Sequence, residues 1–227
     1  MSKKNSFKKF WNYLWNGTTW DSYLVFLIVI FIFIKFLLFP SVGFLLNNDY
    51  PIVAIVSGSM EHKIVSSKIC GNTTADIEKK SLNFDSWWSY CGYYYEDFFN
   101  ISKSDFKDFR YNSGLNIGDV MVLYGKKPEN IEIGEVLVFI PQDKRFFIEK
   151  GPVIHRVVNK WQDDSGKYHF QTKGDHNSQS FTNFENDITQ DNVIGVGIIR
   201  VPFIGYAKIA MNNTLQGIFS ILNLIFS

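Results

Sequence analysis

The sequence has few cysteines, few prolines and almost no excess of charge. Its 227 residues include two cysteines and six prolines, which argues against a disulfide-dense scaffold, a cysteine-based zinc cluster and a proline-rich linker. The 23 lysines and arginines against 22 aspartates and glutamates leave a formal charge of +1. General nucleic-acid binders carry a clear basic excess, so no nucleic-acid partner is expected. The hydrophobic share of 46% is enough for a core, or for a core and a membrane segment.

An apolar run near the amino terminus predicts a transmembrane anchor over residues 23–46. Residues 23–39 read YLVFLIVIFIFIKFLLF, with Lys35 as the single charge, and a helix of this length extends about 25 Å. Residues 1–22 contain four lysines opposed by Asp21 alone. The positive-inside rule therefore predicts a cell-membrane protein with a cytoplasmic amino terminus and an extracytoplasmic remainder. A cleaved secretory signal is the alternative, although the apolar run is long for one.

The pattern of residues 49–205, which follow this anchor, predicts a mainly β domain. Short β-branched runs are separated by turns and show no helical period between them, which favours an all-β domain. The clearest of these runs are 51–56, 118–125, 134–139 and 193–201.

Residues 61–115 form an insertion in this pattern that we expect to be α-rich or irregular. Its aromatic residues, including Trp87 and Trp88, have the spacing of the buried face of one or two helices. A surface that enters the bilayer or holds a partner is the alternative. A disulfide between Cys70 and Cys91 would close a loop of about twenty residues and contribute about 3 kcal/mol, and the sequence leaves this pairing open.

The carboxyl-terminal residues 206–227 are strongly apolar. The run 217–226 is too short to cross a bilayer, so we expect a membrane-associated helix in the interface. A second full span is the alternative, if it begins near Ile204.

Ser59 is the candidate nucleophile. It follows the predicted buried strand 51–56 and adjoins a glycine, which gives it a rigid support and a backbone able to direct N–H groups at an oxyanion. The same Ser-Gly-Ser sequence also forms simple turns. A serine hydroxyl needs a base, and His155 lies in the β-branched run 153–158. The other three histidines are expected at the surface: His62, His169 and His176.

A carboxylate is expected as the third member of such a site. Asp175 follows a glycine at a predicted turn and is the first candidate. A turn aspartate can also simply cap its own backbone.

Together these segments resemble the type I signal peptidases, in the archaeal and endoplasmic-reticulum branch that uses histidine where bacterial enzymes use lysine. The resemblance runs from the membrane segment to Tyr206, apart from the insertion. It implies a mainly β catalytic domain that is anchored by a transmembrane helix. It also implies that Ser59 is the nucleophile and His155 the general base, and that no metal or organic cofactor is needed. It also implies an oxyanion hole made by the Ser57 hydroxyl and the Ser59 N–H. The motifs are SGSM at 57–60, GDV at 118–120, GEV at 134–136, IHRV at 154–157, TKGD at 172–175 and VPFIGY at 201–206.

One departure from the family affects the acid. The family usually carries a second aspartate six residues after the Gly-Asp aspartate, and this position is Phe181 here. The loop 178–190 is longer than the family's and contains Glu185 and Asp187. The resemblance therefore leaves the orienting acid open between Asp175 and Asp187, the latter if the loop folds back.

The resemblance implies signal peptidase I activity, in which a serine endopeptidase removes amino-terminal signal peptides from exported preproteins. The implied partners are preprotein signal peptides, the lipid bilayer and the protein-export translocon. Three alternatives stay open: a membrane-anchored β-rich binding module, a catalytically inactive relative, and a Ser–Lys dyad that uses Lys150 or Lys173.

Overall fold

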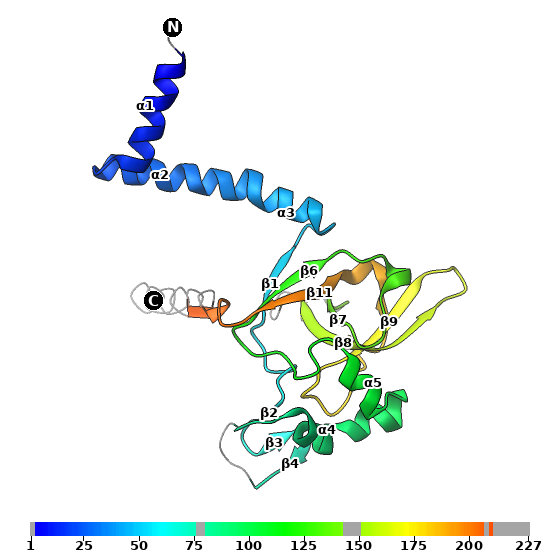
Figure 1. Cartoon of the computed structure of the whole chain (residues 1–227). Coiled ribbons are helices and arrows are strands. Elements are labelled where there is room, and N and C mark those ends of the chain that lie inside the picture. Colours follow the sequence, from blue (N-terminus) through cyan, green and yellow to red (C-terminus); the bar gives the residue numbers. More distant parts are fainter. Residues whose placement is uncertain (1–2, 76–79, 143–150, 207–208, 211–227) are drawn as a thin grey trace, which may run out of the picture. The chain divides into compact units, whose positions relative to one another are not determined.

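The computed structural model describes residues 3–75, 80–142, 151–206 and 209–210 (Figure 1). Most of the predicted carboxyl-terminal helix over 206–227 lies outside the described residues, as does Lys150. The chain divides into two compact units, Met1–Asp49 and Tyr50–Ser227.

The first unit is helical. Helix α1 covers Lys3–Asn16, and a second, continuous helix follows from Trp20 to Leu45. Among the described residues this second helix is the one that is long and apolar enough to cross a membrane. Its 26 residues extend about 39 Å, against about 30 Å for the hydrocarbon core of a bilayer. Its length and composition fit the anchor predicted over 23–46. The continuous helix consists of α2 Trp20–Phe33, the π-helical turn η1 Ile34–Leu38 and α3 Phe39–Leu45.

The π-helical turn ends at Leu38, two residues before Pro40. Proline has no N–H to donate, and a locally wider turn is one way in which a helix accommodates this loss.

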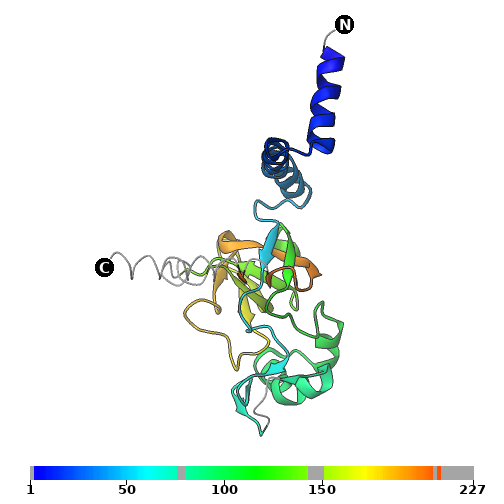
Figure 2. The ribbon, with the colours of Figure 1, turned by 90° about the vertical axis from the view of Figure 1, so that its left-hand side faces the viewer.

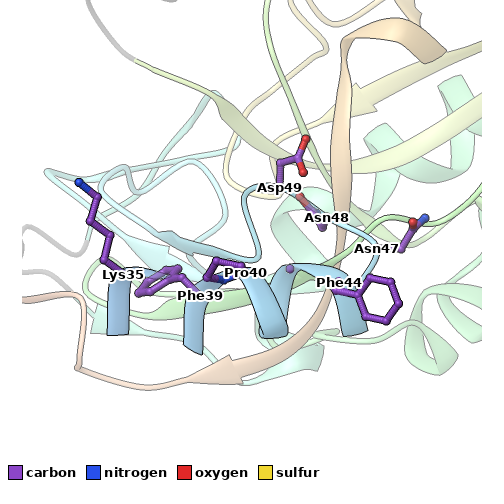
Figure 3. A pocket seen from close by; sticks show the side chains of 8 residues that line it. Lys35, Phe39, Pro40, Phe44, Asn47, Asn48 and Asp49 are labelled. Carbon is purple, nitrogen blue, oxygen red and sulfur yellow. The ribbon is translucent and has the colours of Figure 1, made fainter. Parts of the chain in front are cut away.

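Figure 3 shows Lys35, Pro40 and Phe44 along this stretch, where they line a surface pocket that also includes Asp49. No serine, cysteine or histidine is among the residues that line this pocket, so it is not a candidate for the predicted chemistry.

The second unit contains a seven-stranded, curled antiparallel sheet, which confirms the mainly β prediction (Figure 1). The strand order is β1-β6-β11-β7-β8-β9-β10, and every neighbouring pair is antiparallel. The strands are β1 Ile52–Ala54, β6 Val120–Tyr124, β7 Val136–Phe139, β8 Val153–Gln162, β9 Tyr168–Lys173, β10 Ile188–Thr189 and β11 Val193–Val201.

Strand β7 is central and is buried on both faces. Val136 and Val138 belong to one apolar cluster, and Leu137 and Phe139 belong to another on the opposite face. This is why its sequence is a continuous apolar run instead of an alternating one. Strand β8 pairs with β7 and continues into a hairpin with β9. The sheet therefore holds His155 of β8 on a rigid support.

The insertion is α-rich and gathers at one end of the second unit (Figure 2). Helix α4 buries Trp87, Trp88 and Tyr95 on one face, which confirms the prediction from the aromatic spacing. Cys70 and Cys91 form a disulfide that ties the preceding hairpins to α4. The insertion contains β2 Lys63–Ile64, β3 Lys68–Ile69, β4 Asn72–Thr73, β5 Lys80–Ser81, α4 Phe84–Phe99 and α5 Lys103–Asp108.

Candidate active site

Ser59 lies in the turn that follows the edge strand β1. Backbone hydrogen bonds between Ile55 and the segment at Gly118 and Asp119 hold the chain just before this turn. The Ser59 Oγ lies 2.8 Å from Nε2 of His155 and 3.2 Å from the Ser57 Oγ. The structure thus brings together the predicted nucleophile, the predicted base and the predicted oxyanion residue.

The other nitrogen of His155 contacts a carboxylate that the sequence did not single out. His155 is 5% exposed, and its Nδ1 hydrogen-bonds to Oε1 of Glu185, which is fully buried. The second carboxylate oxygen of Glu185 accepts the Phe181 N–H at 2.7 Å. A hydroxyl, an imidazole and a buried carboxylate therefore lie in series, in the order Ser59, His155 and Glu185.

Neither aspartate expected to orient the histidine takes this place. Asp187 is a surface residue whose carboxylate accepts a hydrogen bond from Nδ1 of His169 at 2.6 Å. Asp175 is fully buried, but it is bound by other groups. The position beside His155 Nδ1 belongs to Glu185, two residues before Asp187 in the same loop.

The local path of the loop explains this difference. Glu185 donates its N–H to the Phe181 carbonyl at 2.9 Å, and its carboxylate accepts the Phe181 N–H, so residues 181–185 close a tight turn. Glu185 also accepts the Thr172 N–H through its carbonyl, which holds the turn against β9. The signal in the sequence was the Phe-x-x-x-Glu spacing of one helical turn. Alone, that spacing does not reveal which way the turn faces.

Asp175 is the centre of a buried polar network. Arg156 donates to both carboxylate oxygens, at 2.9 and 2.7 Å. The Tyr95 hydroxyl donates to Oδ1 at 2.8 Å, and Nε2 of His62 lies 3.1 Å from Oδ2. Burial alone would raise the pKa of Asp175, but the Arg156 guanidinium and the contact with His62 lower this pKa far below its usual value. Asp175 is therefore an ionised, internally paired group.

His62 is not the surface residue that the sequence predicts. It is 4% exposed and its ring stacks on Trp87 with the centroids 3.7 Å apart. Burial lowers the pKa of His62, so the ring is neutral near pH 7. The burial of His62 is not visible in the sequence, because this residue occupies a polar stretch and is covered by Trp87, which lies 25 residues later.

The turn that carries Asp175 also supports Ser59. A side chain on Gly174 would approach the Ser59 carbonyl to 2.8 Å and Nε2 of His155 to 2.9 Å, so only glycine fits there. The His176 N–H donates to the Ser59 carbonyl at 2.8 Å, and the Cys70 N–H donates to the His176 carbonyl at 3.1 Å. The insertion and the turn together therefore brace the backbone of Ser59.

Lys173 has a different environment from the one a Ser–Lys dyad requires. Its ammonium group is buried, donates to the Gly174 carbonyl at 3.1 Å and lies 4.4 Å from the centre of the Tyr95 ring. Burial lowers the pKa of Lys173 to about 8. Of the two candidate bases, His155 lies within hydrogen-bonding distance of Ser59 Oγ, whereas Lys173 donates to the Gly174 carbonyl.

A groove of about 530 Å³ opens at Ser59 and His155. Residues 54–57 line one part of it and residues 151–155 another, and Phe181 and Phe184 contribute aromatic surface. Apolar walls beside a hydroxyl and an imidazole suit a ligand with apolar side chains and a polar group that these two can reach. Among the described residues no group of three or more histidine, cysteine, aspartate or glutamate side chains is placed to hold a metal ion.

A serine hydroxyl, an imidazole and a buried carboxylate in series beside a groove have the geometry found in serine hydrolase sites. No family model matches the chain. It is 28% identical over 100 residues to the signal peptidase complex catalytic subunit SEC11C of Homo sapiens and of Canis lupus familiaris, which covers 42% of this chain and 50% of each relative.

The same identity and length relate the chain to the signal peptidase complex catalytic subunit SEC11 of Colletotrichum graminicola, over 55% of that relative. The chain spans about half the length of the curated relatives it matches. It thus has weak homology to SEC11 signal peptidase catalytic subunits, in agreement with the resemblance to the branch that pairs serine with histidine.

Proposed function

We propose that this protein is a membrane-bound serine endopeptidase that removes signal peptides from preproteins. The observation that carries the proposal is the distance of 2.8 Å between Ser59 Oγ and His155 Nε2, with Glu185 on the other ring nitrogen. The weak homology to signal peptidase complex catalytic subunits supports the same activity. The apolar helix Trp20–Leu45 supports membrane attachment.

In the proposed mechanism His155 accepts the Ser59 proton as Oγ attacks the scissile carbonyl. Glu185 keeps the His155 Nδ1 proton in place, so that Nε2 is free to act as the base, and it stabilises the imidazolium that forms. The Ser59 N–H and the Ser57 hydroxyl bind the oxyanion of the tetrahedral intermediate. His155 then protonates the leaving amine, and water hydrolyses the acyl-enzyme by the same route in reverse order.

The proposed substrate binds as an extended strand in the groove between residues 54–57 and 151–155. Strand β1 is at an edge of the sheet, and edges accept a further strand through main-chain hydrogen bonds. The largely apolar walls of the groove would contact apolar side chains near the cut. A signal peptide held in the same bilayer as the anchor would meet the enzyme within a plane, which shortens the search.

We further propose that the amino terminus is cytoplasmic and that residues 50–206 face the other side of the membrane, where preproteins emerge. This orientation is supported by the lysines that precede the apolar helix. It makes the protein-export translocon the expected supplier of substrate.

The test is removal of the signal peptide from a preprotein in membranes that contain the full chain. Wild type is compared with Ser59→Ala, and with Ser113→Ala as a control at an exposed serine outside the groove. We expect cleavage with wild type and Ser113→Ala, and none with Ser59→Ala. A serine-reactive acylating probe should label the first two proteins and spare the third. Equal labelling or cleavage by Ser59→Ala would rule out the assigned nucleophile, and absence of both from folded wild type would favour a binding module or an inactive relative.

A further inference from the structure

Helix α1 carries an apolar face that the proposed catalytic function does not use. Phe7, Phe10, Trp11 and Trp15 recur at intervals of three and four residues, the period of one helix face. Their exposed fractions lie between 46% and 66%. The rings of Phe7 and Trp11 are 6.0 Å apart and those of Trp11 and Trp15 are 5.7 Å apart, so they form a continuous aromatic ladder.

The opposite face of α1 is polar and basic. Lys9, Asn12 and Asn16 are exposed there, and Lys8 is exposed at the border between the two faces. Residues 1–19 contain four lysines and no acidic residue. An amphipathic helix with aromatic residues on one face and lysines on the other is typical of helices that lie in the interface of a membrane.

A defined corner joins α1 to the apolar helix. Trp15 contacts Phe26 of α2 edge to face at 5.4 Å, and the Tyr13 hydroxyl donates to the Asp21 carboxylate at 2.5 Å. Gly17 is required at the corner, because a side chain there would approach the Tyr13 carbonyl to 2.4 Å. As a result α1 runs crosswise to α2 in both views (Figure 1, Figure 2).

If α2 crosses the bilayer, then α1, which runs crosswise to the beginning of α2, lies along the membrane surface. We propose that α1 lies in the headgroup layer on the side where α2 begins and binds anionic phospholipid. Phe7, Trp11 and Trp15 face the acyl chains, and Lys8 and Lys9 face the lipid phosphates. This inference depends on the membrane attachment proposed for Trp20–Leu45 and is independent of the catalytic residues.

Anionic lipid fits this surface better than a protein partner does. The lysines of α1 have no acidic neighbour within the helix, so an anionic surface supplies the missing charge. The apolar face is also continuous with the belt of exposed apolar side chains on α2, such as Leu27 and Phe31, through the contact of Trp15 with Phe26. One bilayer can cover both surfaces at once.

The test places a fluorescent label on single introduced cysteines in the full chain, reconstituted in phosphatidylcholine vesicles with and without phosphatidylglycerol. The two native cysteines are bonded to each other and do not react. Trp11→Cys reports the apolar face of α1, and Asn12→Cys is its matched control about 100° around the helix. Leu27→Cys reports the anchor itself.

Brominated acyl chains should quench the labels at positions 11 and 27 and spare the label at position 12. Strong quenching at position 27 with equal quenching at 11 and 12 would overturn the placement of α1 and leave the anchor intact. Weak quenching at position 27 would overturn the anchor and, with it, this inference.

A second experiment tests whether the lipid headgroup is anionic, by removing single positive charges from α1. In vesicles with phosphatidylglycerol, Lys8→Gln and Lys9→Gln should each lower the ratio of docked to undocked α1 about fivefold, as read from quenching at position 11. Lys103→Gln and Lys107→Gln on α5 make the same change of charge elsewhere and should leave that ratio unchanged. Quenching at position 11 that does not depend on phosphatidylglycerol or on these two lysines would overturn the assignment to anionic lipid.

Discussion

Glu185→Gln is the substitution that tests the proposed catalytic arrangement most directly. The two side chains have nearly the same size, so the buried site stays filled. Phe181 donates its N–H to the Glu185 carboxylate, and the amide oxygen of the variant would keep this bond. The amide NH₂ would then face Nδ1 of His155. Nδ1 would have to accept a hydrogen bond, which puts the ring proton on Nε2 and removes the base from Ser59.

The expected cost follows from the burial of this pair. A hydrogen bond to a charged group contributes about 1.5–3 kcal/mol. A carboxylate about 4 Å from an imidazolium stabilises it by about 4 kcal/mol at an effective dielectric constant of about 20. Both estimates describe the same pair of groups, so they are not added. They give an activation barrier for acylation that is higher by about 3–4 kcal/mol in the variant, so we expect kcat to fall about 10²- to 10³-fold while KM changes little.

The assay is single-turnover cleavage of a preprotein by the full chain, with Asp187→Asn as the matched control. Both substitutions neutralise one carboxylate of the same loop, but Asp187 is exposed and contacts His169 instead of His155. We expect Asp187→Asn to stay within about twofold of wild type. Thermal unfolding must show that Glu185→Gln is folded. The reasoning fails if folded Glu185→Gln keeps near-normal kcat, or if Asp187→Asn loses as much activity.

Three further predictions concern the surroundings of the site. Tyr95→Phe removes one hydrogen bond to Asp175, so thermal unfolding should show a loss of about 1–2 kcal/mol, and an unchanged midpoint would contradict the network. Reduction of the disulfide between Cys70 and Cys91, 21 residues apart, should cost about 3 kcal/mol by the same measurement, and the double serine variant should no longer respond to reductant. Burial lowers the pKa of Lys173 to about 8 from an ordinary value of 10.5. Between these pH values the unfolded chain therefore binds more protons than the folded chain, so the free energy of unfolding should rise with pH, by up to about 1.4 kcal/mol per pH unit. In Lys173→Met that slope should disappear, and an identical slope in both proteins would refute the assignment.

The sequence predicts the scaffold well because local patterns determine it. Continuous β-branched runs become buried strands such as β7, and the aromatic spacing of 84–99 becomes the buried face of α4. The contact between Ser59 and His155 is also foreseeable, because the turn after β1 and strand β8 carry these residues in motifs of recognisable order. Each of these predictions depends on residues close together in the chain, or on a resemblance that already includes the long-range pairing.

The burial of His62 and the choice of Glu185 were not predictable in the same way. The ring of His62 is covered by Trp87 and meets Asp175, which lies 113 residues further along. The orientation of Glu185 depends on a turn closed by Phe181 and held against Thr172. Both outcomes are decided by contacts that neither hydrophobic period nor residue type encodes.

The network around Asp175 gives a physical reason why this motif residue does not orient His155. An ionised carboxylate accepts about four hydrogen bonds, and four donor groups already occupy Asp175: two from Arg156 and one each from Tyr95 and His62. A bond to His155 would have to displace one of them and leave a buried polar group without its partner, which costs about 1–3 kcal/mol. A carboxylate from a separate loop avoids this cost. Asp175 can then hold the insertion and the Ser59 turn together while the proposed catalytic role belongs to Glu185.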